Sequence, residues 1–336
     1  MKVQFINANQ AAGMIQDGSN VGLIGGGSGL VEATLLHEYI EKRFLDTGTP
    51  KELTCIHALG IGDREARGMN RFAHKGMVRR VIGGHWVWSP KMQQLARENS
   101  IEAYVLPGGV IMQLMREVAA KRPGLITHVG LGTFVDPLQD GGRMNEAAVD
   151  PLVERITIDG KDYLRYLPIP IDVALLKGSY ADEEGNISLD EEPANLDIYA
   201  MAAAAHNSGG KVIFQVRKKV AAGSIPARSV RIPSAIVDAV VVDPEQRQSY
   251  EIIYDPSISG ERRDETFKPD FPEFSLRLII ARRAYQELRE GSVINYGFGI
   301  PDQVASIVAA EERQDSFYQT IEHGTYGGSL LRGNLF

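Results

Sequence analysis

The chain has 336 residues and a formal net charge of −7 at pH 7. A negative charge disfavours a surface that follows nucleic-acid phosphates, so we expect no nucleic-acid partner. Hydrophobic residues make up 43% of the chain and charged residues 24%, which is typical of a globular protein, and the length allows two domains.

The sequence also argues against a membrane span, a disulfide bond within the chain and a metal site. No apolar run approaches the ~20 residues that span a bilayer, and the first residues lack the apolar core of a signal peptide, so we expect a cytoplasmic protein with no membrane partner. The one cysteine, Cys55, lies in an apolar stretch and is expected to be buried and structural. The seven histidines form no i, i+4 pair, so we predict no metal site.

Strands alternate with helices through the first part of the chain. Apolar runs and helical periodicity predict a helix at 8–16, a strand at 21–24, a helix at 30–44, strands at 53–58 and 78–82, a helix at 91–98, a strand at 103–106, a helix at 110–120 and a strand at 125–129. This alternation favours an open α/β domain with a largely parallel sheet. Ligands bind such sheets at the carboxyl ends of the strands, and glycine-rich loops follow several of these strands, at 25–29, 60–62, 83–84 and 130–132.

The first glycine loop is not a dinucleotide-binding fingerprint. Counted from Gly25, the pattern G-x-G-x-x-G needs a glycine at the position of Leu30. A strand, a glycine turn and a helix still place a helix N-terminus where an anion can bind. A nicotinamide-dependent oxidoreductase is therefore disfavoured.

Two later regions interrupt the alternation of strands and helices. Residues 155–166 alternate around the turn Asp159-Gly160, which predicts a small antiparallel excursion, and strands at 172–176, 212–216 and 235–242 with a helix at 193–207 follow it. Residues 255–274 lose periodicity and contain three prolines, which indicates a linker between a first domain at 1–254 and a second at 275–336.

The second domain begins as the first one does. A helix at 276–288, the turn Glu290-Gly291-Ser292, a strand at 293–296, a glycine loop and a helix at 302–311 repeat the order found at the start, where the turn is Asp17-Gly18-Ser19. We therefore expect two related domains. The second has too few strands to cover its own sheet, so we expect it to be incomplete, or to complete itself against the first domain or another chain.

Near the end, one carboxylate is followed by glycines. Glu322 comes after a short β-prone run and before Gly324, Gly327 and Gly328. Glycines let a ligand approach the backbone closely, and free N–H groups beside a carboxylate suit a nucleophile with an anion-stabilising nest. The alternative is a surface acid on a glycine-rich turn.

Together these stretches resemble family I coenzyme A transferases, most closely the acetate/propionate-type short-chain acyl-CoA transferases. The resemblance runs over essentially the whole chain. Its motifs are GGGSGL at 25–30, GGHW at 83–86, THVGLGTFVDP at 127–137, GSYADEEGN at 178–186, NYGFGIP at 295–301 and E-x-G-x-x-G-G at 322–328.

The resemblance implies a ping-pong transfer of coenzyme A from acetyl-, propionyl-, butyryl- or acetoacetyl-CoA to a carboxylate, through a glutamyl-CoA thioester on Glu322. It implies no permanently bound cofactor, coenzyme A as substrate and covalent intermediate, and a homo-oligomer, either dimer or tetramer. The residues that it assigns to coenzyme A binding are Asn295, Tyr296, Gly297, Phe298 and Gly299. Those that it assigns to the acyl pocket or oxyanion contacts are Gly26, Gly27, Gly130, Gly132, Thr133, Phe134, Gly327 and Gly328.

Two features depart from the family pattern. Relatives usually have Pro-Gln-Gly in the turn before the helix at 110, where this chain has Gly108 in place of the glutamine. Relatives also carry a longer second domain that supplies further contacts to coenzyme A. The alternative function is therefore a catalytically silent form that folds and associates without turnover, and the acyl-chain preference stays open.

Overall fold

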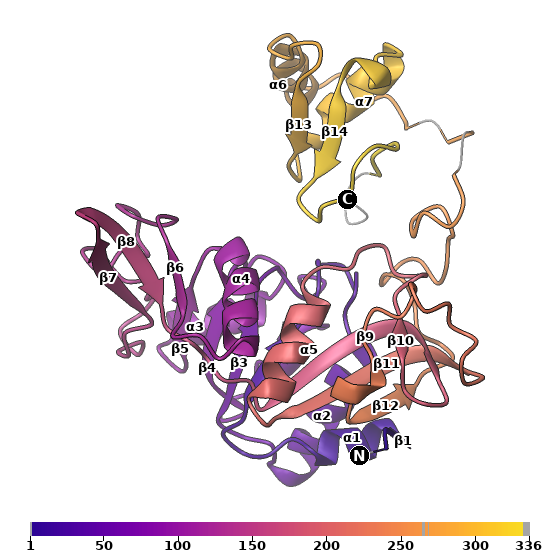
Figure 1. Cartoon of the computed structure of the whole chain (residues 1–336). Coiled ribbons are helices and arrows are strands. Elements are labelled where there is room, and N and C mark those ends of the chain that lie inside the picture. Colours follow the sequence, from indigo (N-terminus) through magenta and orange to yellow (C-terminus); the bar gives the residue numbers. More distant parts are fainter. Residues whose placement is uncertain (1, 264–265, 268, 332–336) are drawn as a thin grey trace. The chain divides into compact units, whose positions relative to one another are not determined.

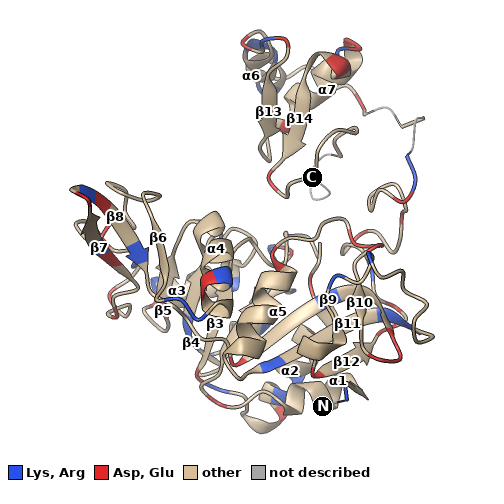
Figure 2. Ribbon diagram, viewed as in Figure 1, with Lys and Arg blue, Asp and Glu red and all other residues tan. Residues whose placement is uncertain are grey.

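The computed structural model describes residues 2–263, 266–267 and 269–331 (Figure 1). The chain divides into two compact units, Met1–Asp255 and Pro256–Phe336. No helix in the described residues is long and apolar enough to cross a membrane. Figure 2 shows acidic and basic residues interspersed in both units.

The first unit is built on a nine-stranded sheet in which eight strands run parallel. Their spatial order is β1 (Gln4–Ile6), β12 (Ala239–Val242), β11 (Lys211–Val220), β9 (Val173–Asp182), β2 (Asn20–Leu23), β3 (Leu53–His57), β4 (Val78–Gly83) and β5 (Glu102–Val105). The short β10 (Ile187–Ser188) pairs antiparallel with β9. The expectation of an open, largely parallel α/β sheet is confirmed.

Helices cover both faces of this sheet, because successive strand side chains alternate between two cores. In β3, Cys55 belongs to the core under α1 (Ala8–Gly13), α2 (Thr34–Thr47) and α3 (Pro90–Arg97). Its neighbour Ile56 belongs to the core under α4 (Gly108–Ala119) and α5 (Ile198–Asn207). Burial raises the pKa of the Cys55 thiol to about 12, which agrees with the expected structural role.

A small antiparallel sheet lies beside α4 (Figure 1). The predicted excursion is confirmed as β7 (Val153–Ile158) and β8 (Lys161–Tyr166), joined at Asp159-Gly160. The predicted parallel strand at 125–129 is wrong: β6 (Leu125–Thr127) pairs antiparallel with the free edge of β8. A short apolar run can form a strand without specifying its partner, and here the hairpin offers the nearer open edge.

Two helices begin later than their periodicity predicts. Residues 30–33 form a turn, in which Gly26 N donates to Leu30 O at 2.9 Å and Val31 has a φ of +58°. The helix α2 therefore begins at Thr34. In the same way Leu196 has a φ of +43°, and α5 begins only at Ile198. A left-handed backbone cannot continue into a right-handed helix.

The second unit contains α6 (Leu276–Tyr285), β13 (Val293–Tyr296), α7 (Asp302–Ala310) and β14 (Tyr318–Ile321). Strands β13 and β14 are parallel, and α6 and α7 contribute Leu278, Ala281 and Ile307 to a small core of their own. Short 3₁₀ turns occur at Met69–Phe72, Ser234–Ile236 and Gln314–Ser316.

Candidate active site

Glu322 is the first residue after β14, on an exposed turn. Gly324 N donates to Ile321 O at 3.0 Å, and Ile321 N donates to Thr325 O at 3.2 Å, which closes the turn. The hydroxyl of Thr320 donates to Thr325 O at 2.8 Å, and Gly327 N donates to Gln319 O at 2.9 Å. The segment from Glu322 to Gly328 therefore folds back along its own strand and holds the carboxylate at the strand end.

The second glycine loop of this unit lies at the same end of its sheet. Tyr296 pairs with Ile321 in the parallel register, so Gly297 and Glu322 leave adjacent strands side by side. Phe298 is 41% exposed. The phenol of Tyr296, by contrast, is buried and donates to Gln319 Oε1 at 2.9 Å. Any contact of Tyr296 with a ligand therefore involves its backbone.

In the first unit, the Gly25–Gly29 loop leaves the carboxyl end of β2 and is fastened to the loop after β3. Ser28 N donates to Gly62 O at 2.9 Å, and Leu30 N donates to Gly27 O at 3.0 Å. Gly27 has a φ of +82°, and a Cβ there would lie 2.7 Å from the Trp88 ring. The loop thus packs against Trp88, where Arg64 lies over the indole at 4.3 Å.

A buried carboxylate that sequence reasoning missed holds these loops. Glu32 is fully buried and accepts hydrogen bonds from Gly62 N at 3.0 Å, Gly29 N at 3.3 Å and the hydroxyl of Tyr250 at 2.5 Å. Burial raises its pKa to about 7, although these donors and Lys177 act in the opposite direction. The only signal in the sequence was an acid among the apolar residues that follow a glycine loop.

The Gly130–Phe134 loop follows β6 of the small sheet, so its predicted place at an end of the parallel sheet is wrong. Thr133 Oγ1 donates to Gly130 O at 2.8 Å. The buried Asp136 organises the turn, because it accepts from Gly132 N at 2.8 Å, Leu138 N at 3.0 Å and Arg155 at 2.9 Å. The Gly132 and Leu138 N–H groups and the Arg155 charge lower the Asp136 pKa below its usual value.

The same loop returns to the edge of the main sheet. Gly142 N donates to Phe134 O at 3.1 Å, and Gly142 O accepts from Val105 N at 2.8 Å, at the carboxyl end of β5. Phe134 itself is 48% exposed. Gly108 is the first residue of α4, and its backbone packs on the loop after β3. A Cβ on Gly108 would lie 2.8 Å from Ala58 O. A glutamine at this position would need the Ala58 carbonyl to move.

The predicted residues therefore form three groups. Gly26 and Gly27 lie in a cluster of loops at the carboxyl ends of β2 and β3, and Gly130, Gly132, Thr133 and Phe134 lie in the loop that follows β6. Residues 295–299 and Glu322 lie at one end of the β13–β14 pair, whereas Gly327 and Gly328 follow the segment that folds back along β14 beside Gln319. Within the described residues, no three His, Cys, Asp or Glu side chains are placed to hold a metal ion.

Comparison with known proteins decides the family. Residues 5–243 match the family described as Coenzyme A transferase. The chain belongs to this family. It is 39% identical over 337 aligned residues to an acetate CoA-transferase of Escherichia coli K12, YdiF, covering 100% of this chain and 63% of that protein. It is 40% identical to a caffeate CoA-transferase of Acetobacterium woodii, covering 97% of this chain and 62% of that protein.

Solved coenzyme A transferase structures support the same assignment. The crystal structure of YdiF from Escherichia coli O157:H7 as a thioester complex with coenzyme A matches with a TM-score of 0.92 and 37% identity, covering 98% of this chain and 65% of that one. The YdiF apoenzyme matches with the same TM-score at 39% identity. The chain thus spans about 63% of the length of these coenzyme A transferases. Membership of the coenzyme A transferase family excludes the alternative function of a nicotinamide-dependent oxidoreductase.

Proposed function

We propose that this coenzyme A transferase chain moves coenzyme A from a short-chain acyl-CoA to an acceptor carboxylate, with Glu322 as the nucleophile. The observation that carries the proposal is the exposed carboxylate at the end of β14, beside the glycine loop of β13. The relative of known structure was crystallised as a thioester complex with coenzyme A, which supports a thioester on the enzyme.

In the proposed reaction, coenzyme A is transferred from one acyl group to another by way of Glu322. The Glu322 carboxylate attacks the thioester carbonyl carbon, the C–S bond breaks, and the products are a mixed anhydride and coenzyme A thiolate. The thiolate then attacks the glutamyl carbonyl and releases the original acyl group as its carboxylate. This leaves a glutamyl-CoA thioester, from which an acceptor carboxylate takes coenzyme A by the reverse steps. The scheme is ping-pong and needs no added oxidant, metal or cofactor.

The residues around Glu322 have the physical properties that these steps need. A carboxylate needs no general base to remove a proton from it before attack, but it is a weak nucleophile. Rate must therefore come from N–H donors aimed at the developing oxyanion and from the binding energy of coenzyme A. Of the two glycines expected to supply such donors, Gly328 is the proposed one, because the N–H of Gly327 already donates to Gln319 O. Residues 295–299 are the proposed coenzyme A contacts.

The loops of the first unit are the proposed acyl-binding elements. Gly26 is half-buried, Gly27 is buried against the Trp88 ring, and Phe134 offers an exposed apolar face. An apolar surface with a few backbone donors suits a short acyl chain that carries one carboxylate or thioester group. The proposal includes a homo-oligomeric assembly of this chain.

Intact-protein mass spectrometry after mixing with acetyl-CoA or propionyl-CoA tests the proposal. A glutamyl-CoA thioester adds the mass of coenzyme A less one water, and borohydride reduces it to an alcohol that peptide mapping locates. We expect the modification on Glu322. Protein that circular dichroism shows to be folded, but that stays at its original mass, would favour the silent alternative.

A further inference from the structure

Three loops of the first unit meet at the Glu32 carboxylate. Gly29 belongs to the loop after β2, Gly62 to the loop after β3, and Tyr250 to the segment after β12, 218 residues along the chain from Glu32. Tyr250 N also donates to Ser28 O at 2.8 Å. A Cβ at Gly29 would lie 2.6 Å from Tyr250 N, so this glycine lets the two segments touch.

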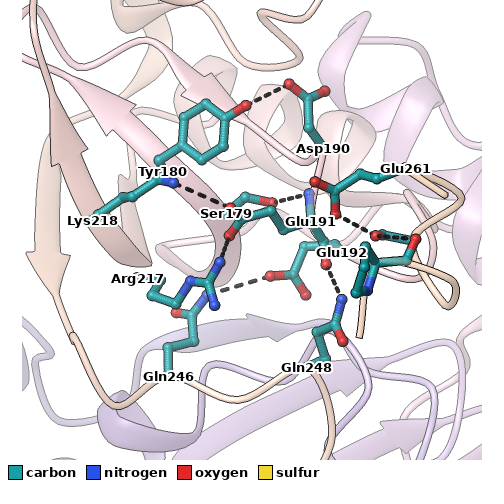
Figure 3. A network of polar contacts seen from close by, with 12 residues as sticks. Ser179, Tyr180, Asp190, Glu191, Glu192, Arg217, Lys218, Gln246, Gln248 and Glu261 are labelled. Atoms are coloured by element: carbon teal, nitrogen blue, oxygen red, sulfur yellow. Dashed lines mark hydrogen bonds and ion pairs between the residues drawn. The ribbon is translucent and has the colours of Figure 1, made fainter. Parts of the chain in front are cut away.

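A buried polar network fixes the segment that carries Tyr250. Figure 3 shows the part of it in which Gln246 and Gln248 lie beside Glu191 and Glu192. Lys177 Nζ, on β9, donates to the carbonyls of Arg247 at 2.7 Å and Gln248 at 3.3 Å. The Gln248 amide donates to Glu191 O at 2.7 Å, and the Gln246 amide donates to Gly178 O at 2.7 Å. Four contacts therefore tie residues 246–248 to β9 and to the chain after β10.

The charges of this network are paired around Lys177. Glu192 Oε2 lies 3.0 Å from Lys177 Nζ, and both side chains are almost completely buried. Glu191 pairs with Arg217 and with Lys218 at 3.2 Å. Lys177 is thus paired with Glu192, and it lowers the pKa of Glu32 only through its electric field. Asp63 acts in the same way on Tyr250, whereas Arg67 lies over the Tyr250 ring at 4.8 Å.

We propose that Glu32 and Tyr250 are positioning residues that hold the loop after β2 and the loop after β3 in one arrangement for substrate. The proposal deepens the proposed function, because the loop after β2 is one of those assigned to the acyl group and the loop after β3 is fastened to it. Neither side chain touches the reacting atoms; each acts through Gly29 and Gly62. The hydrogen bonds of residues 246–248 with Lys177, Gly178 and Glu191 hold the segment in which the Tyr250 hydroxyl can donate to Glu32.

The order of the two loops depends on pH, because Glu32 can gain or lose a proton. A carboxyl group that is buried while the loops are closed holds its proton more firmly than one that opening exposes to water. The pKa of Glu32 is raised to about 7 by burial. The charged or titratable groups around the pair are Lys177, Asp63, Arg67 and the phenol itself. Since loss of that proton favours the open state, we expect the two loops to become less ordered as the pH rises from 6 to 8.

Amide hydrogen exchange followed by mass spectrometry tests the proposal without requiring turnover. The variants are Tyr250→Phe, which removes one hydroxyl, and Glu32→Gln, which keeps the shape of the side chain. Tyr104→Phe is the matched control, because Tyr104 is a buried tyrosine whose hydroxyl donates to a different carbonyl, Asp150 O at 3.1 Å. Rates are corrected for the intrinsic pH dependence of exchange.

We expect exchange at Gly29 and Gly62 to rise about tenfold in Tyr250→Phe and to be unchanged in Tyr104→Phe. In the unmodified chain, protection of these amides should decrease between pH 6 and pH 8, and Glu32→Gln should remove that decrease. Equal exchange in Tyr250→Phe and in the control, or a decrease that persists in Glu32→Gln, would overturn the proposal.

Turnover of the same proteins separates this proposal from the proposed function. Where the unmodified chain transfers coenzyme A, Tyr250→Phe should raise the KM for the acceptor carboxylate several-fold and leave the thioester on Glu322 detectable. A chain without turnover would contradict the proposed function, while the exchange rates at Gly29 and Gly62 would still decide whether Glu32 and Tyr250 position the loops.

Discussion

Glu322 and Glu32 show how the surroundings of a carboxylate separate two roles. Glu322 is exposed on a turn beyond its strand, where a ligand can reach it. Glu32 is fully buried and satisfied by two backbone N–H groups and a phenol, so its contribution is to geometry. The difference follows from burial and donor number.

Replacement of Glu322 tests the nucleophile directly. Glu322→Gln and Glu322→Ala should abolish coenzyme A exchange, because neither side chain can form the thioester. Since the carboxylate lies on an exposed turn, the melting temperature should stay within about 2 °C, as for most surface substitutions. A steady-state assay with circular dichroism measures both, and near-normal turnover in either variant would disprove the mechanism.

Asp136 controls the shape of the loop that carries Phe134. Asp136→Asn retains one acceptor oxygen but loses the charge that pairs with Arg155, so we expect a loss of about 1–3 kcal/mol at pH 7. The Asp136 pKa is lowered in the folded state, so its stabilisation is present above the unfolded pKa and disappears as the pH falls through the folded value. Urea unfolding at pH 7 and pH 3.5 should therefore show a difference between variant and parent that shrinks at the lower pH.

At the scale of elements, the two strand pairs β2–β3 and β13–β14 repeat one hydrogen-bond pattern. Gly18 N donates to Lys51 O and Gly291 N to Ser316 O; Thr54 N donates to Ser19 O and Tyr318 N to Ser292 O. Following this register along the second strand of each pair, Ala58 occupies the position that corresponds to Glu322. The two pairs thus share their turn and pairing, and only the second carries a carboxylate at the strand end.

The strand β9 depends on its buried ion pair. Lys177→Met leaves Glu192 buried without a cation and should cost about 3–5 kcal/mol, because an unpaired buried charge is strongly unfavourable. The double variant Lys177→Met, Glu192→Leu should recover much of that loss, since no charge is then buried alone. Thermal unfolding of the parent, both single variants and the double variant gives the coupling; additive losses would show that the pair is not coupled.

At the scale of the whole molecule, the chain forms two compact units that meet at Asp255–Pro256. The described residues between Pro256 and Phe274 contain no helix or strand, and Arg262 and Arg263 are exposed. The proposed function assigns loops of the first unit and Glu322 of the second to one reaction. We propose that the first unit folds as a domain of its own.

Limited trypsin digestion tests this domain division. Cleavage after Arg262 or Arg263 should precede cleavage in the main sheet, whose strand hydrogen bonds protect the backbone. The larger fragment should keep its helical and sheet circular dichroism signal after the smaller one is removed. Early cuts inside residues 1–255 would contradict the proposal.

The sequence by itself determined the α/β class, the antiparallel excursion, the buried Cys55 and the resemblance to coenzyme A transferases. These depend on apolar periodicity and on glycine motifs, which act over a few residues and survive in any context. The place of Glu322 beyond a strand is predictable in the same way.

Only the tertiary structure decided which edge β6 joins, where α2 and α5 begin, and which side chains hold the glycine loops. The partner of a short strand depends on the open edge that lies nearest, and β8 is more than 30 residues further along the chain than β6. Glu32 meets Tyr250 across 218 residues, and no local pattern marks that contact. Burial, and with it the raised pKa of Glu32, exists only once β2, β3 and the segment after β12 pack together.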